Sequence, residues 1–169
     1  MLNNQVTLEN LEEKDKEQFI LDNQEAFQVA ALGVLANHLE EEPVISRQDI
    51  EESLANGIAY RICLDGERVG GAVVSINGDK GDLELLFISP NMQGKGIGYT
   101  AWALLEKAYP KVKIWQTMTP YFDKRNIHFY VNRCGFQIVE FFHPHHPDRH
   151  RSDDGKGLDE MFRFEKRKV

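Results

Sequence analysis

The chain has 169 residues, of which 41% are hydrophobic, and its 27 acidic residues outnumber its 20 basic residues to give a net charge of −7. That length suits a single domain, residues 1–169, with one hydrophobic core. The acidic balance disfavours nucleic acid as a partner, because non-specific binding to phosphate backbones needs a basic face. Cys63 and Cys134 lack CxxC spacing, so we expect buried, reduced thiols and neither a disulfide scaffold nor a zinc site.

The amino-terminal stretch, MLNNQVTLENLEEKDKEQF, has neither a basic start nor a continuous apolar segment. A secretory signal needs both features, and a membrane span needs the second. We therefore expect a cytoplasmic protein without a membrane partner.

Two helices are predicted at the start of the chain. Residues 16–39 place apolar side chains at the spacing of an amphipathic helix with one core face. These side chains are Phe19, Ile20, Phe27, Ala30, Ala31, Val34 and Leu35. Ser46 then offers an N-cap for a short second helix, with Asp49 three residues later and Gly57 as its stop.

Three strand-like segments follow, at residues 58–64, 68–76 and 82–90. The Asp65-Gly66 pair between the first two favours a tight hairpin. The far end of the third segment is apolar on both faces, so we expect this strand at the centre of the sheet. A helical pattern then runs from residue 96 to residue 108 and ends before Pro110.

The last predicted elements are a strand, a helix and a strand pair, at residues 111–118, 123–135, 136–142 and 159–167. Asp123 is the expected N-cap of the helix, and Gly135 stands just past its end. The order of elements predicts an α/β (α+β) fold, with a mixed, mostly antiparallel central sheet flanked by helices and a central crossover helix.

The stretch MQGKGIGYTA, residues 92–101, places Gly94, Gly96 and Gly98 where a strand runs into a helix. The first N–H groups of a helix lack internal partners, and glycine lets phosphate oxygens approach the backbone, so this turn is typical of a pyrophosphate cradle. A P-loop string is absent, and a GxGxxG fingerprint would need glycine where Tyr99 stands. The pattern that fits is Q-x-x-G-x-G, starting at Gln93.

Together with LELLFISP before it and FYVNRCGF after it, this stretch resembles the GNAT superfamily of N-acetyltransferases, which bind acetyl-CoA through a [Q/R]-x-x-G-x-[G/A] loop. The resemblance covers residues 58–142 well and the order of strands and helices throughout. It implies a GNAT-like fold, acetyl-CoA as co-substrate, and direct attack of a primary amine on the acetyl thioester in a ternary complex.

The resemblance also implies which residues bind the co-substrate. Backbone N–H groups of Gln93, Gly94, Lys95, Gly96, Ile97, Gly98 and Tyr99 are expected to hold the pyrophosphate. Lys95 either adds a charge-assisted contact to a phosphate or is a solvated surface lysine. Leu86, Phe87 and Ile88 are expected to pair with the pantetheine arm, in a cleft where this strand splays from the next.

Tyr130, in FYVNRCGF, matches the family tyrosine that points at the CoA sulfur, so it is the expected donor to the departing thiolate; a core tyrosine is the alternative. Glu84 is the expected base for the amine, or else a solvent-facing glutamate, and strand alternation places it on one face with Leu86. The family often has asparagine where this chain has Asp123. Either Asn126 takes over the pantetheine contact or neither residue makes it.

The segment FFHPHHPDRH holds His143, His145, His146 and His150. We expect a loop that shapes the acceptor site, with His145 or His146 as proton acceptors of pKa ~6.5; an ordinary polar loop is the alternative. The spacing matches no common zinc signature, so no metal is expected.

The leading interpretation is an acetyl-CoA-dependent N-acetyltransferase acting on an amine of a small molecule or a protein. Two others stay open: a non-catalytic acyl-CoA-binding module, and a metal-binding regulatory domain built on the histidine loop. A homodimer is common in the superfamily, and no sequence feature decides it.

Overall fold

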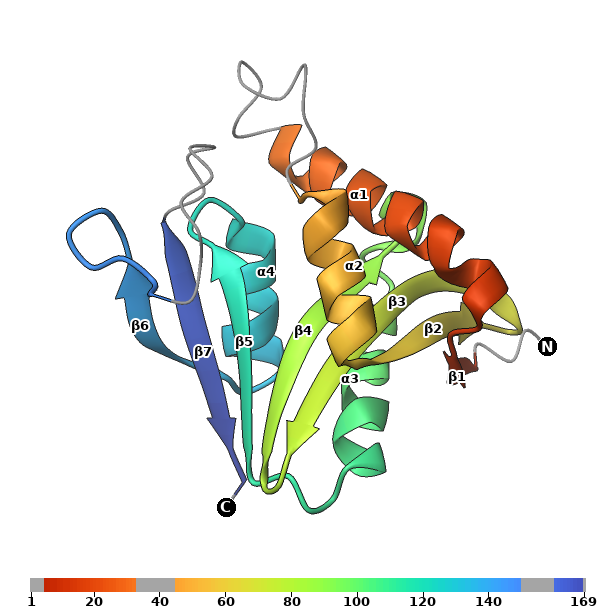
Figure 1. Cartoon of the computed structure of the whole chain (residues 1–169). Helices are drawn as coiled ribbons and strands as arrows, with labels where there is room; N and C mark the ends of the chain where they lie inside the picture. Colours follow the sequence, from red (N-terminus) through yellow and green to blue (C-terminus); the bar gives the residue numbers. More distant parts are fainter. Residues whose placement is uncertain (1–4, 33–44, 150–159, 169) are drawn as a thin grey trace.

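A computed structural model describes residues 5–32, 45–149 and 160–168 (Figure 1). These residues form one sheet in the order β1-β2-β3-β4-β5-β7-β6, and neighbouring strands are antiparallel except for β4 and β5. The strands are β1 (Val6–Asn10), β2 (Ile58–Leu64), β3 (Glu67–Asn77), β4 (Lys80–Ile88), β5 (Ile114–Pro120), β6 (Gln137–Phe142) and β7 (Met161–Arg167). The predicted α/β fold with a mostly antiparallel sheet is confirmed, and β4 lies at its centre as expected.

Helices cover both faces of this sheet (Figure 1). They are α1 (Lys16–Leu32), α2 (Arg47–Asn56), α3 (Ile97–Ala108) and α4 (Lys124–His128), with the short turns η1 (Glu13–Asp15) and η2 (Pro90–Met92) and a π-helical turn, η3 (Phe129–Arg133). One apolar cluster joins α1 and α2 to β3 and β4. A second cluster joins α3 and η3 to the opposite face of the sheet.

Strand β1 was not predicted. Its residues pair with β2 in antiparallel register, from Val6 opposite Leu64 to Asn10 opposite Tyr60. Val6 and Leu8 pack against the cluster that contains α3, while Thr7 and Glu9 alternate with them along the strand. This alternation spans only five residues, and its partner strand lies far away in the sequence, so the local pattern gave little signal.

The predicted helix caps and turns are present. The Ser46 side chain accepts a hydrogen bond from the Asp49 N–H at 3.1 Å, at the start of α2. Asp65 and Gly66 have φ angles of 52° and 86°, as a tight hairpin between β2 and β3 requires. The predicted first helix agrees with α1 through Leu32, and its expected remainder, including Val34 and Leu35, lies outside the described residues.

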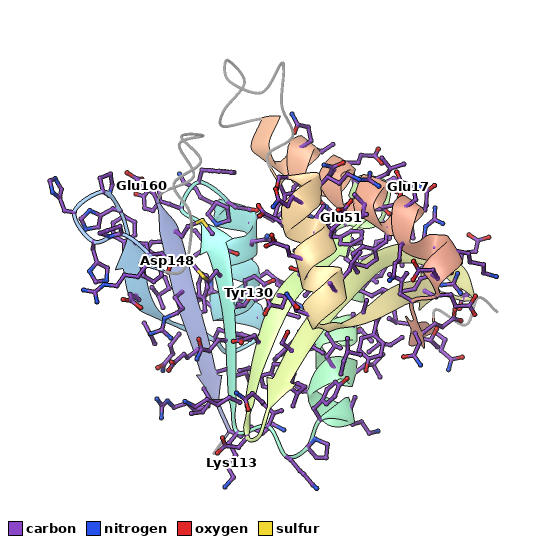
Figure 2. All side chains as sticks on the ribbon, viewed as in Figure 1. Glu17, Glu51, Lys113, Tyr130, Asp148 and Glu160 are labelled. Carbon is purple, nitrogen blue, oxygen red and sulfur yellow. The ribbon has the colours of Figure 1, made fainter. Side chains whose placement is uncertain are left out.

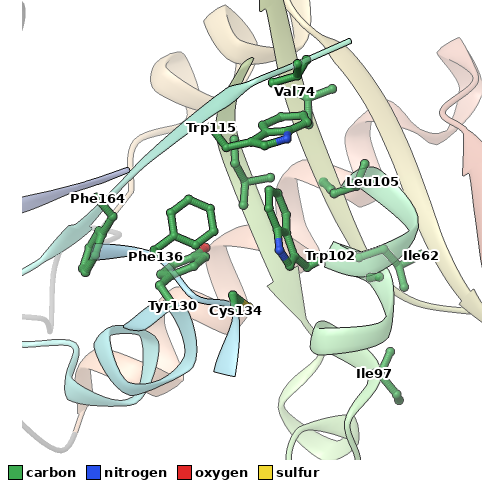
Figure 3. Packing of buried hydrophobic residues seen from close by; sticks show 14 of the residues in the cluster. Ile62, Val74, Ile97, Trp102, Leu105, Trp115, Tyr130, Cys134, Phe136 and Phe164 are labelled. Carbon is green, nitrogen blue, oxygen red and sulfur yellow. The ribbon is translucent and has the colours of Figure 1, made fainter. Parts of the chain in front are cut away.

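The larger cluster centres on two tryptophans (Figure 3). The rings of Trp102, on α3, and Trp115, on β5, meet edge to face with centroids 5.2 Å apart. Gly81 on β4 makes room for them, because a Cβ there would lie 2.7 Å from the Trp115 ring. This packing fixes α3 against β4 and β5, and so fixes the start of α3 beside the ends of those strands.

Candidate active site

The parallel strands β4 and β5 pair over only three positions, from Lys80 opposite Ile114 to Asp82 opposite Gln116. Just beyond, the Thr117 hydroxyl donates a hydrogen bond to the Leu83 carbonyl at 2.9 Å. The strands then separate, as Figure 1 shows. The expected splay is therefore present, and it leaves one edge of β4 without a partner strand in the described part of the chain.

A β-bulge interrupts β4 at Glu84. Leu83 pairs with Val74 and Leu85 with Val73, so Glu84 is an extra residue on its strand. As a result Leu83 and Leu86 pack in the cluster of α3, whereas Leu85 packs against α1 and α2.

The expectation that Glu84 shares a face with Leu86 is therefore wrong. A bulge shifts the alternation of side chains along its strand. Glu84 instead lies near Ser75, which hydrogen bonds to it, and Asp82. The Glu84 side chain is in contact with solvent, but neighbouring protein atoms partly desolvate its carboxylate. This desolvation and the negative charge of Asp82 raise the pKa of Glu84, whereas the hydrogen bond from Ser75 lowers it.

A pocket of about 290 Å³ opens beside the free edge of β4. One wall comes from Leu86, Phe87, Ile88, Met92, Gln93, Gly94, Gly96, Ile97, Gly98 and Tyr99. The other comes from Asp123, Arg125, Asn126, His128, Phe129, Tyr130 and Arg133, with Ala26 and Phe27 of α1 nearby. The structure thus brings together nearly all of the predicted co-substrate residues with Tyr130, but Glu84, Lys95, His145 and His146 do not line this pocket.

The glycine loop presents main-chain groups to the pocket. Gly94 and Gly96 have φ angles of 79° and 80°, a left-handed conformation that favours glycine. Gly96 is the N-cap of α3, and no side chain caps this helix end. The first N–H groups of α3 are therefore available to a ligand, with the positive end of the helix dipole behind them.

Tyr130 lies in the π-helical turn that follows α4 (Figure 2). The Cys134 N–H donates to the Phe129 carbonyl at 3.0 Å, five residues back, which widens the helix here. The Tyr130 ring is only 4% exposed and packs beside Phe136 and Phe164, as Figure 3 shows. This burial raises the pKa of the phenol well above its usual value, so the hydroxyl stays protonated at neutral pH.

Asp123 caps α4 as predicted, its side chain accepting a hydrogen bond from the Asn126 N–H at 3.1 Å. It is also buried in the pocket wall, and burial raises its pKa against the opposing effects of that hydrogen bond and the Arg125 charge. Asn126 lines the pocket too. Which of the two contacts a pantetheine arm stays a prediction.

The remaining candidates lie elsewhere. Lys95 is exposed, with its ammonium 3.9 Å from the Met92 sulfur. In the histidine segment after β6, the His146 ring stacks on Phe142 and its Nε2 lies 2.8 Å from a Glu140 carboxylate oxygen. No group of potential ligands within the described ranges is arranged to hold a metal ion. The assignment of His145 and His146 to the acceptor stays a prediction.

The sequence analysis did not single out three side chains of the second wall, Arg125, His128 and Arg133. A signal was available for Arg133, because residues 126, 129, 130 and 133 have the spacing of one helix face. Phe27, expected in the core face of the first helix, instead lines the pocket. No helix in the described residues is both long and apolar enough to span a membrane.

Comparison with known proteins agrees with this geometry. The sequence model of the acetyltransferase (GNAT) family matches residues 11–136. The chain belongs to the acetyltransferase (GNAT) family. Its acyltransferase class follows from that membership. The chain is also 44% identical over 172 aligned positions to the uncharacterized protein YrkN of Bacillus subtilis (strain 168), covering 95% of this chain and 92% of that protein.

Solved structures share the fold of this GNAT protein. PaiA N-acetyltransferase from Thermoplasma acidophilum, in complex with coenzyme A, superposes with a TM-score of 0.69 at 18% identity, covering 97% of this chain and 99% of that one. Spermidine N-acetyltransferase from Vibrio cholerae, in complex with CoA and spermine, superposes with a TM-score of 0.66 at 18% identity. The match covers 98% of this chain and 96% of that one. At these identities the likeness establishes the fold alone.

Proposed function

We propose that this GNAT protein transfers the acetyl group of acetyl-CoA to a primary amine of a small molecule or a protein, by direct attack in a ternary complex. The observation that carries the proposal is one pocket that joins an uncapped, glycine-lined helix start, a free strand edge and a buried tyrosine. The two structural neighbours described above, each solved with CoA, share this fold, which supports the choice of co-substrate.

The residues present fit the parts of acetyl-CoA. Backbone N–H groups between Gln93 and Tyr99 would hold the pyrophosphate, where Gly94 and Gly96 allow close approach. Main-chain groups of residues 86–88 would pair with the amides of the pantetheine arm along the free edge of β4. The co-substrate supplies the activated acetyl thioester, and the protein supplies its position.

Tyr130 is the proposed donor to the departing thiolate. Reference pKa values of ~10 for a phenol and ~8.5 for a thiol make full proton transfer uphill by about 2 kcal/mol. Burial raises the phenol pKa further, so Tyr130 stabilises the developing negative charge by a hydrogen bond that strengthens during the reaction.

Glu84 is the proposed base. A lysine-like amine has a pKa of ~10.4 and must lose a proton before it attacks. Because Glu84 does not line the pocket, it would take that proton through water, from the side of the sheet that faces α1 and α2. Its raised pKa makes it a stronger base than an ordinary glutamate.

Calorimetric titration with acetyl-CoA tests the proposal. We expect binding to the wild type and its loss in a Gly96→Glu variant, whose carboxylate would occupy the anion cradle. A free-thiol assay with a panel of polyamines and lysine peptides then tests transfer. A folded wild type that fails to bind millimolar acetyl-CoA would contradict the proposal.

A further inference from the structure

Arg133 and Tyr99 meet where the two walls of the pocket come together. The guanidinium carbon of Arg133 lies 5.5 Å from the centroid of the Tyr99 ring, and both residues line the pocket from opposite walls. Tyr99 is 44% exposed and Arg133 is exposed too, so the pair is in reach of solvent. A cation over the face of an aromatic ring is held there by the ring quadrupole, so the guanidinium has a defined position.

The charge of Arg133 lacks a carboxylate partner among the described residues. Five arginines of this acidic chain do form ion pairs with Asp or Glu: Arg47, Arg61, Arg68, Arg163 and Arg167. Arg125, the other arginine of the pocket, lies close enough to Asp123 for its charge to act on that carboxyl. An arginine left uncompensated in a pocket of a protein with net charge −7 favours an anionic ligand.

The two anionic parts of CoA match two separate places in this pocket. The N–H groups of the glycine loop suit the pyrophosphate, which needs several converging donors. Arg133 lies beside the first turn of α3, over the Tyr99 ring, so its side-chain donors differ from the backbone donors of the loop. Its planar guanidinium presents paired donors with the geometry of a phosphomonoester, and CoA carries a phosphomonoester on its ribose.

We propose that Arg133, anchored on the Tyr99 ring, binds the ribose 3′-phosphate of acetyl-CoA at a subsite separate from the pyrophosphate cradle. The inference rests on the proposed use of acetyl-CoA. Its consequence is selectivity: the protein distinguishes acetyl-CoA from acetyl-3′-dephospho-CoA, and Arg133 carries that discrimination.

The test is calorimetric titration of both ligands into the wild type and an Arg133→Gln variant. Arg133 is exposed, so the substitution leaves the core intact. We expect the wild type to bind acetyl-CoA about tenfold or more tightly than the dephospho analogue, as a charged hydrogen bond would give. In Arg133→Gln that ratio falls below about twofold, through weaker binding of acetyl-CoA alone. Tyr99→Leu, which removes the anchor, gives an intermediate ratio.

Lys107→Gln is the matched control, because it removes a positive charge from an exposed position of α3 outside the pocket; its ratio equals that of the wild type. Three results would contradict the proposed subsite. The wild type could bind the two ligands equally, Arg133→Gln could weaken the binding of both ligands equally, or Arg125→Gln rather than Arg133→Gln could lose the discrimination between them. A wild type that binds neither ligand overturns the proposed function itself.

Discussion

The pocket has one wall built from β4, the glycine loop and the start of α3, and another built from α4 and η3. The first presents main-chain groups, because Gly94 and Gly96 adopt left-handed conformations and α3 begins without a side-chain cap. The second presents side chains, with Tyr130 buried and Arg133 exposed. The two walls therefore offer different chemical groups to a ligand.

This difference suggests a division of labour. Main-chain donors bind any pyrophosphate carrier that fits, and they tolerate changes in neighbouring side chains. A side chain such as that of Tyr130 acts at one atom of the ligand, so its loss affects a single step. Substitutions in the glycine loop should therefore weaken binding, whereas substitution of Tyr130 should slow the chemistry.

Tyr130→Phe should give the largest effect on turnover. It removes the hydroxyl and keeps the ring that packs against Phe136 and Phe164. We expect kcat to fall by about 100-fold or more, within the range for loss of a proton donor, while the Kd for acetyl-CoA changes less than twofold. Tyr121→Phe, at a 49% exposed tyrosine, is the control. Equal activity of the two variants in the thiol assay would remove Tyr130 from the chemistry.

Glu84→Gln should lower turnover by about tenfold or more, because a positioned base is lost. In the wild type the rate should fall as pH drops through the Glu84 pKa, since only the carboxylate accepts a proton. That pKa is raised, so the fall begins at a higher pH than for an ordinary glutamate. Asp82→Asn removes one cause of the raised Glu84 pKa, so the loss of activity should begin at a lower pH than in the wild type. A pH profile shifted the other way would contradict this role.

Gly96→Ala and Gly98→Ala should change stability in opposite directions. Alanine at position 96 must adopt a φ near 80°, which costs about 1 kcal/mol. Gly98 lies inside α3, where a Cβ would meet Phe129 at 3.5 Å in ordinary contact, so alanine should gain up to about 1 kcal/mol of helix propensity. Denaturant unfolding measures both values; the same sign for both would refute the loop conformation.

Lys95→Gln should give the smallest effect, less than a twofold change in the Kd for acetyl-CoA. Lys95 is exposed and does not line the pocket, so the wall that contains Gly94 and Gly96 should bind acetyl-CoA without it. A loss of fivefold or more by calorimetry would mean that a side chain, and not the main chain alone, holds the ligand on this wall.

The sequence predicts the glycine loop well, because glycine at positions 94 and 96 indicates a left-handed backbone conformation that other residues rarely adopt. The sheet around β4 was equally predictable, since its apolar far end indicated a central strand and the Asp65-Gly66 turn fixed the preceding hairpin.

Features that depend on partners distant in the sequence were not predictable. The bulge at Glu84 arises from the register between β3 and β4, and no local pattern in β4 reveals it. Strand β1 exists because β2 pairs with it. The π-helical turn at Tyr130 depends on the hydrogen bond from the Cys134 N–H to the Phe129 carbonyl, which changes the spacing that a regular helix would give.

Amide hydrogen exchange with and without acetyl-CoA tests most directly whether the main chain of one wall binds this ligand. We expect slower exchange at residues 86–88 and 94–99, and unchanged exchange in β6 and in residues 143–149 after it. Slower exchange confined to those histidine-containing residues, with none in the glycine loop, would contradict it.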